Sequence, residues 1–137
     1  MRYILLAVLA AGSMVANAQD TYKVRLRPVP HDNATARTIA GSGQATATLV
    51  GTKLTVTGTF EGLSGAATVG KIHQGVRMGV RGNPILDLTV SKADKGSISG
   101  TLDLTPALVE SLKAGRLYIQ IAAEKAPEGN IWGWLAK

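Results

Sequence analysis

Short runs in which apolar and polar residues alternate are the feature that most limits how this chain can fold. In the first such run Tyr22, Val24 and Leu26 alternate with lysine and arginine. Successive side chains of a β-strand point to opposite faces, so a period of two indicates a strand with one buried face and one solvated face. The chain is therefore expected to be built mainly from half-buried strands.

A β-hairpin is predicted within residues 44–60. Two alternating runs, 44–50 and 53–60, are separated by Gly51-Thr52, and a glycine in a two-residue connection favours a tight turn. Its second strand is expected to bury Leu54, Val56 and Phe60 and to expose Thr55, Thr57 and Thr59. The preceding residues 31–43 have no clear period and predict a loop.

Five more strand-like runs follow, and one helix interrupts them. The runs are residues 69–73, 84–90, 97–104, 117–123 and 130–136, the last two joined by a loop at 124–129. The helix has Thr105 as its expected N-cap, Pro106 in its first turn and Gly115 after its last residue. This spacing predicts an all-β sandwich or barrel of about eight strands with one short helix, and of the two we expect an antiparallel, Greek-key-like β-sandwich.

The first 18 residues predict export. Arg2 precedes an apolar run, 4–15, and Ala16-Asn17-Ala18 matches an A-x-A cleavage site, which is the layout of a secretory signal peptide. The apolar run is too short and interrupted for a stable membrane span. We expect residues 1–18 to be removed and residues 19–137 to form one periplasmic or secreted domain without a transmembrane segment. An uncleaved N-terminal anchor is the alternative.

Charge and cysteine content exclude several classes of protein. The formal net charge is +6, falling to about +5 when Arg2 leaves with the signal peptide, and the basic residues are dispersed. A dispersed, modest charge is not a nucleic-acid signature, so no nucleic-acid partner is expected. The absence of cysteine excludes disulfides, thiolate metal sites and a cysteine nucleophile.

Several stretches together resemble the CHRD (chordin-type) domain family. They are LVGTKLTVTGTFEGLSG, KIHQG, GNPILDL, SISGTLDLTPALVESLKAGRLYIQI and PEGNIWGWL. The similarity spans about residues 22–135, and its most specific part is LTPALVESLKAGRLYIQI. The resemblance implies an antiparallel β-sandwich and a single exported bacterial domain. For chordin it implies extracellular protein binding, and for bacterial members it implies no established activity.

The chain departs from the family pattern at a set of polar positions. The family usually has Ile-His-Gly after the FxGL turn, and Ile72-His73-Gln74 keeps that histidine. A second family histidine falls on Ala122, a glutamate on Asn130 and an arginine on Trp132. Of these four polar residues only His73 remains, which weakens any chemistry inherited from the cluster.

Catalytic and metal-binding patterns are weak. There is no G-x-S-x-G motif and no suggestive Ser-His-Asp spacing, so we expect no enzyme activity and no cofactor. Metal sites need three or four convergent ligands, and the chain offers His31 in a loop and His73 on a strand. A copper or zinc site combining His73 with Asp87 or Asp103 stays open as an alternative.

The parity of the last two strands predicts an aromatic patch. Apolar residues such as Ile119 and Ile131 share the expected core faces, which leaves Tyr118, Trp132 and Trp134 on the opposite face. His73 is expected beside them. Such a patch suits a binding surface. Alternatively, the helix or the long N-terminal loop covers the tryptophans as a second small core.

These patterns lead to one functional hypothesis and two alternatives. The leading hypothesis is an exported, non-enzymatic binding domain whose partner is an envelope or extracellular protein or a glycan. Its predicted contact residues are His73, Tyr118, Trp132 and Trp134, with Arg77 and Arg81 of the glycine-rich loop GVRMGVRG at the rim. The alternatives are a periplasmic metal-binding protein that uses His73 and a structural component of the envelope.

Overall fold

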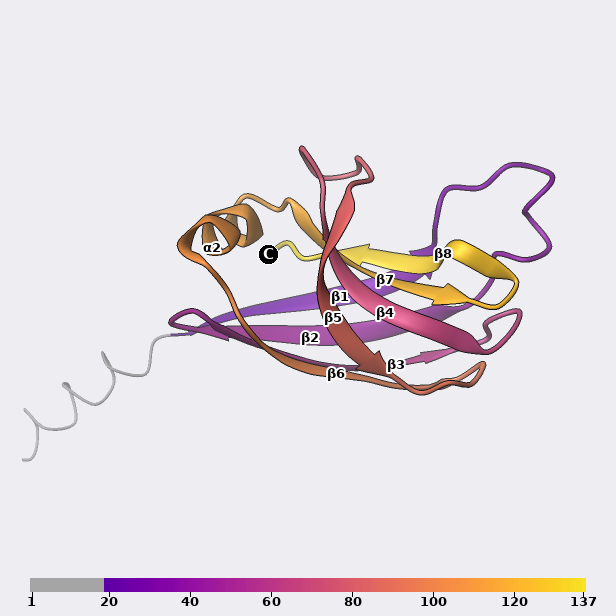
Figure 1. Cartoon of the computed structure of the whole chain (residues 1–137), viewed down its shortest axis with the longest axis horizontal. Helices are drawn as coiled ribbons and strands as arrows, with labels where there is room; N and C mark the ends of the chain where they lie inside the picture. Colours follow the sequence, from indigo (N-terminus) through magenta and orange to yellow (C-terminus); the bar gives the residue numbers. More distant parts are fainter. Residues whose placement is uncertain (1–18) are drawn as a thin grey trace, which may run out of the picture.

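The computed structural model describes residues 19–137, so the predicted signal peptide lies outside the described residues. These residues form eight antiparallel strands and one helix (Figure 1). In chain order the elements are β1 (Asp20–Pro28), β2 (Ser42–Val50), β3 (Lys53–Glu61), β4 (Ala67–Gln74), β5 (Asn83–Val90), β6 (Gly96–Asp103), α2 (Pro106–Lys113), β7 (Leu117–Ala123) and β8 (Ala126–Trp134).

The strands form one closed barrel in the order β1-β2-β3-β6-β5-β4-β7-β8. The consecutive strands β4, β5 and β6 are neighbours, and β7 returns through α2 to lie beside β4, which is a Greek-key connection. The predicted all-β, antiparallel fold with one short helix is confirmed. The predicted sandwich is corrected, because the sheet closes on itself.

Closure depends on two strands that each pair with both halves of the barrel. β1 runs along β2 from Asp20 to Leu26 and then pairs with β8 through Arg27 and Pro28. β5 pairs with β4 over most of its length and reaches β6 only through Thr89 and Val90. A strand that changes partners along its length joins two sheets at a corner. Alternation along single strands does not reveal these corners.

The predicted hairpin and its inward residues are confirmed. β2 and β3 pair in continuous register from Ser42↔Glu61 to Val50↔Lys53, and Leu54, Val56 and Phe60 are buried. The inner face of this half carries small residues between the large ones. A Cβ on Gly100 would lie 2.7 Å from a methyl carbon of Leu88, so the missing side chain gives Leu88 its space. Small residues therefore let the two halves pack closely.

The helix α2 begins and ends where the sequence predicts. The Thr105 hydroxyl accepts a hydrogen bond from the Leu108 backbone N–H at 3.2 Å, Pro106 opens the helix, and Gly115 follows its end with a φ of 75°. A left-handed φ favours glycine at this position. The helix packs Leu112, fully buried, against the core. Among residues 19–137, no helix has the length and apolar character needed to cross a membrane.

The last strand begins earlier than predicted. β8 covers Ala126–Trp134, so the turn after β7 is formed by Glu124 and Lys125 alone. The register shifts between Ile121 and Ala123, which accommodates extra residues of β8 in an irregularity. The expected loop at 124–129 is therefore too long, and Pro127 and Gly129 are tolerated in β8 because the strand is irregular at this point.

Candidate functional site

The predicted aromatic residues meet on the outer face of strands β4, β7 and β8. Strand register places His73 opposite Tyr118, and Tyr118 opposite Trp134. The rings of His73 and Tyr118 stack with centroids 4.9 Å apart, and Trp134 lies 4.4 Å from Tyr118. Trp132 packs edge-on against both, at 5.3 Å from Tyr118 and 5.5 Å from Trp134. We call these four residues the aromatic cluster.

Tyr118 is buried at the centre of this cluster although it points away from the barrel interior. Its exposed fraction is 1%. Its hydroxyl donates to the Gly82 carbonyl at 3.2 Å and accepts from the Gly82 backbone N–H at 3.0 Å. His73 Nδ1 lies 3.0 Å from the same carbonyl. The end of the β4–β5 loop is thus fixed to the cluster by three polar contacts.

The two tryptophans are half-buried. The Arg81 guanidinium lies 5.8 Å from the centre of the Trp132 ring, within cation–π range. A Cβ on Gly75 would lie 3.0 Å from Trp134, so the ring packs close to bare backbone. These contacts of the tryptophans come neither from the helix nor from the long N-terminal loop. The cover is the loop 75–82, and it leaves part of each indole accessible.

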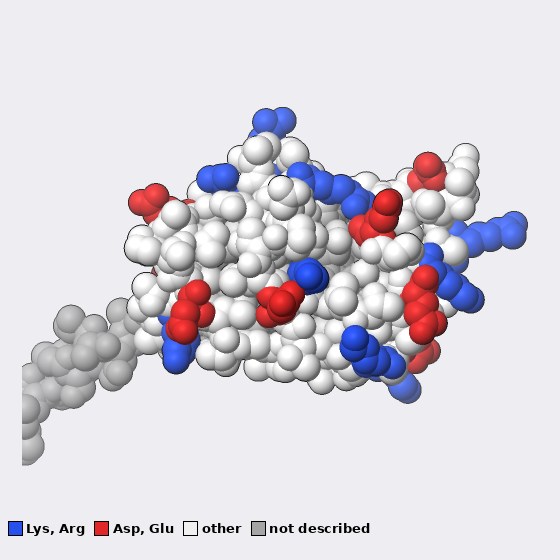
Figure 2. Space-filling model, viewed as in Figure 1, with Lys and Arg blue, Asp and Glu red and all other residues white. Residues whose placement is uncertain are grey.

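The loop 75–82 projects from the barrel above the cluster, at the crest of the view in Figure 1. Val76 is 71% exposed and Met78 is 50% exposed. Arg77 is also exposed, and of the two loop arginines Arg81 is the one whose guanidinium lies within cation–π range of a cluster ring. Figure 2 shows basic side chains on and beside this projection. Apolar and cationic groups are therefore presented together at its tip.

Asn130 anchors the long loop 29–41. Its carbonyl accepts from the Val29 N–H at 3.0 Å, and its side-chain Oδ1 accepts from the Ala40 N–H at 2.8 Å. Asn130 is fully buried, and its Nδ2 has no partner among residues 19–137. This residue therefore holds both ends of the loop rather than serving in a surface site.

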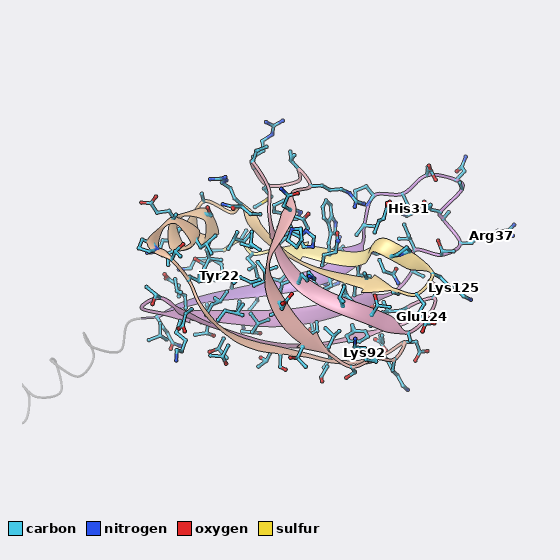
Figure 3. All side chains as sticks on the ribbon, in the orientation of Figure 1. Tyr22, His31, Arg37, Lys92, Glu124 and Lys125 are labelled. Carbon is cyan, nitrogen blue, oxygen red and sulfur yellow. The ribbon has the colours of Figure 1, made fainter. Side chains whose placement is uncertain are left out.

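A hollow of about 700 Å³ lies between the long loop and the β7–β8 turn. Figure 3 shows His31 on the loop and Lys125 at the turn, at the same end of the barrel. Arg81 lines the hollow and donates to the carbonyls of Pro30 at 3.4 Å and Glu128 at 3.3 Å. Arg81 thus connects the hollow to the aromatic cluster.

The alternative of a copper or zinc site has no set of ligands among the described residues. No group of three or more histidine and carboxylate side chains comes within reach of one ion in residues 19–137. Asp87 pairs with Lys71, with 3.2 Å between Nζ and Oδ1, instead of facing His73. His73 remains a ring stacked on Tyr118, with its Nδ1 directed to backbone.

Sequence reasoning missed the residues that cover the cluster. Gly75 and Gly82, whose backbone packs against Trp134 and Tyr118, lie in a loop, where no strand period assigns a side chain to a face. The only signal was the alternation of glycine with apolar and basic residues in GVRMGVRG. Gly82 acts through its backbone, which no side-chain pattern reveals.

Comparison with known proteins identifies one family. A family model described as the CHRD domain matches residues 14–135. No curated protein and no solved structure matches the chain. The matched segment contains every strand described above, from the start of β1 to the end of β8.

Proposed function

Because this chain belongs to the CHRD domain family, we propose that it is an exported, non-enzymatic binding domain that contacts a protein of the cell envelope. The observation that carries the proposal is the loop 75–82, which carries two exposed apolar side chains, Val76 and Met78, and is fixed at both ends beside a packed aromatic cluster. Export rests on the signal-peptide pattern of residues 1–18.

The composition of the loop tip favours a protein partner over a glycan. Val76 and Met78 offer apolar area, and Arg77 stands between them in the sequence. Methionine, arginine and aromatic residues are enriched at protein–protein interfaces. The tryptophans by themselves suit a glycan equally well, but the exposed Val76 and Met78 side chains favour a protein.

The aromatic cluster supplies a rigid base for the loop. The hydrogen bonds between Tyr118 and Gly82 fix one end, and the Gly75 N–H donates to the Arg116 carbonyl at 2.8 Å near the other end. A loop held in place before binding loses less conformational entropy when a partner binds. The exposed edges of Trp132 and Trp134 then extend the contact beyond the loop.

The test uses two matched double variants. Val76→Ser with Met78→Ser removes apolar area at the tip, and Val50→Ser with Val69→Ser removes it from valines that are exposed elsewhere. A photo-crosslinking residue in place of Arg77, in cells, is expected to join the protein to a discrete envelope protein. Only the tip variant is expected to lose that product.

Loss of the crosslink in both double variants, or in neither, would overturn the assignment of the surface. Replacing Trp132 and Trp134 together by alanine is expected to weaken the same crosslink. The far-ultraviolet circular dichroism of that variant must match the parent protein, since half-buried rings also stabilise the fold. A crosslink only between copies of this chain would instead support the structural alternative.

Export has a separate measurement. Mass spectrometry of the protein purified from its native cells is expected to show an N-terminus at Gln19, immediately after the predicted cleavage site. Recovery of the intact Met1 end in a membrane fraction would support the uncleaved anchor.

A further inference from the structure

The outer face of strands β1, β2, β3 and β6 is an array of hydroxyl side chains in continuous register. The rows across the four strands are Thr21–Thr48–Thr55–Thr101, Lys23–Thr46–Thr57–Ser99 and Arg25–Gln44–Thr59–Ser97. Every outward position of β3 and β6 within these rows is threonine or serine. We call these twelve residues the hydroxyl face.

The hydroxyl face is open to solvent, and the hydroxyls of its central strand are free to bind. Figure 1 places the helix and both long loops on the other side of the barrel. Thr55, Thr57 and Thr59 are exposed, and their hydroxyls make no hydrogen bond to any residue that the structure describes. Neighbouring rows are about 6.7 Å apart along a strand and neighbouring columns about 4.8 Å apart across strands.

Two shallow hollows lie on this face and form one groove. Their volumes are about 710 and 560 Å³, and they share Arg25, Gln44 and Thr59. The groove therefore runs from Lys23 on β1 to Lys95 at the β5–β6 turn. An extended polymer could lie along it without moving any element.

The charges along the groove favour an anion. Lys23 and Arg25 line one side and Lys95 lines one end, while Glu61 is the one acidic residue in the lining. None of these three cations has a carboxylate within ion-pair distance in residues 19–137. Cations at every second position of β1 suit a polymer with regularly spaced negative charges.

From this array we propose that the hydroxyl face binds an acidic polysaccharide. Hydroxyl side chains can both donate and accept hydrogen bonds, as sugar hydroxyls require, and the basic edge pairs with uronate or sulfate groups. A protein partner is disfavoured because the twelve residues include no large apolar or aromatic side chain. The same lack of aromatic rings disfavours single-stranded nucleic acid, which binds by base stacking. This site lies on the half of the barrel away from the aromatic cluster and does not depend on the protein-binding proposal.

The experiment measures binding of the purified protein to polygalacturonate by isothermal titration calorimetry, with dextran as an uncharged polymer and duplex DNA as another polyanion. Binding to polygalacturonate is expected, stronger than to either of the others, and weaker at higher salt concentration. Lys23→Gln with Arg25→Gln is expected to weaken it about tenfold, through the loss of two charge-assisted contacts. Arg37→Gln with Lys125→Gln, which changes the net charge equally at two residues outside the groove lining, is expected to leave affinity unchanged (Figure 3).

A second pair of substitutions tests the hydroxyls separately. Thr46→Val with Thr57→Val keeps the branched shape that a strand favours and removes only the hydroxyl groups. Affinity for polygalacturonate is expected to fall about threefold to tenfold, because hydrogen bonds to the polymer are lost. No binding by the parent protein, equal losses in both charge variants, or DNA binding as tight as polygalacturonate would each overturn the proposal. Crosslinking through the loop 75–82 should be unchanged in all of these variants, which separates the two surfaces.

Discussion

Tyr118 shows how a side chain outside a barrel becomes buried. It lies on the outer face of β7, yet stacking by His73 and contact with two indoles leave it 1% exposed. The sequence predicted which residues share this face, because strand parity determines it. Their cover could not be predicted, since it consists of Gly82 backbone and loop side chains that obey no period.

Tyr118→Phe tests the link between the cluster and the loop. The ring and its packing stay, but both hydrogen bonds to Gly82 are lost. We expect a loss of about 1 kcal/mol in the free energy of unfolding and faster hydrogen exchange at the Gly82 amide. Denaturant titration and exchange monitored by NMR measure the two effects. Tyr22→Phe is the control, because the Tyr22 hydroxyl bonds to no other described residue; equal effects in both variants would contradict the assigned role.

Asn130 is the residue whose buried side chain holds the end of the long loop. Asn130→Ala removes the acceptor of the Ala40 N–H within a fully buried site. The expected cost is about 1–3 kcal/mol of unfolding free energy, with the loop 29–41 exchanging faster. Asn83→Ala, at an exposed position of β5, should change stability by less than about 0.5 kcal/mol. Comparable losses in both variants would mean that the loop anchor contributes nothing.

At the scale of single elements, the sequence was most informative where local chemistry decides the outcome. The β2–β3 hairpin and both ends of α2 follow from turn and cap residues that act within a few positions. The predicted start of β8 was wrong by four residues, because proline and glycine at positions 127 and 129 are typical of a turn. Pairing with β7, which is a long-range contact, extends the strand past them.

The N-cap of α2 gives a prediction at this scale. Thr105→Ala removes the acceptor for the Leu108 N–H, and the expected cost is about 1 kcal/mol of unfolding free energy. Thr105→Ser should restore most of that loss, since serine keeps the hydroxyl. Urea denaturation midpoints compare the variants. If serine behaves like alanine, the hydroxyl is not what stabilises the start of the helix.

The long loop carries a pH-dependent turn. Hydrogen bonds from the Thr35 backbone N–H, the Thr35 hydroxyl and the Ala34 N–H hold the pKa of the Asp32 carboxyl below its ordinary value of 3.8. Because the pKa is lowered in the folded protein, the ionised carboxylate stabilises the turn fully at pH values above 3.8. This contribution to stability is lost as the pH falls through the folded pKa. NMR titration of the Thr35 amide should show a midpoint below 3.8, and Asp32→Asn should abolish it. A midpoint at or above 3.8 would contradict the assignment.

At the scale of the whole molecule, the barrel is closed by two narrow seams. One pairs Arg27 and Pro28 with Trp132 and Ile131, and the other pairs Thr89 and Val90 with Ser99 and Ile98. Strands β2 and β3, by contrast, pair in continuous register along their whole length. Strand spacing left a sandwich and a barrel open, and the family resemblance implied the sandwich, because alternation describes each half of the molecule without showing how the halves join. The few residues that join the halves lie at strand ends, where no pattern distinguishes a corner from a turn.

The seams should be the first part of the sheet to open. Each is held by few backbone hydrogen bonds, whereas opening the β2–β3 ladder would expose core residues such as Leu54 and Val56. Free energies of opening therefore should be lower for amides at Thr89 and Trp132 than for those at Val56. Native-state hydrogen exchange across a series of low denaturant concentrations measures them residue by residue. Seam amides should exchange through local openings with little dependence on denaturant, and β2–β3 amides through global unfolding. If both groups share one free energy and one denaturant dependence, the barrel unfolds as a single unit and the seams are as stable as the rest of the sheet.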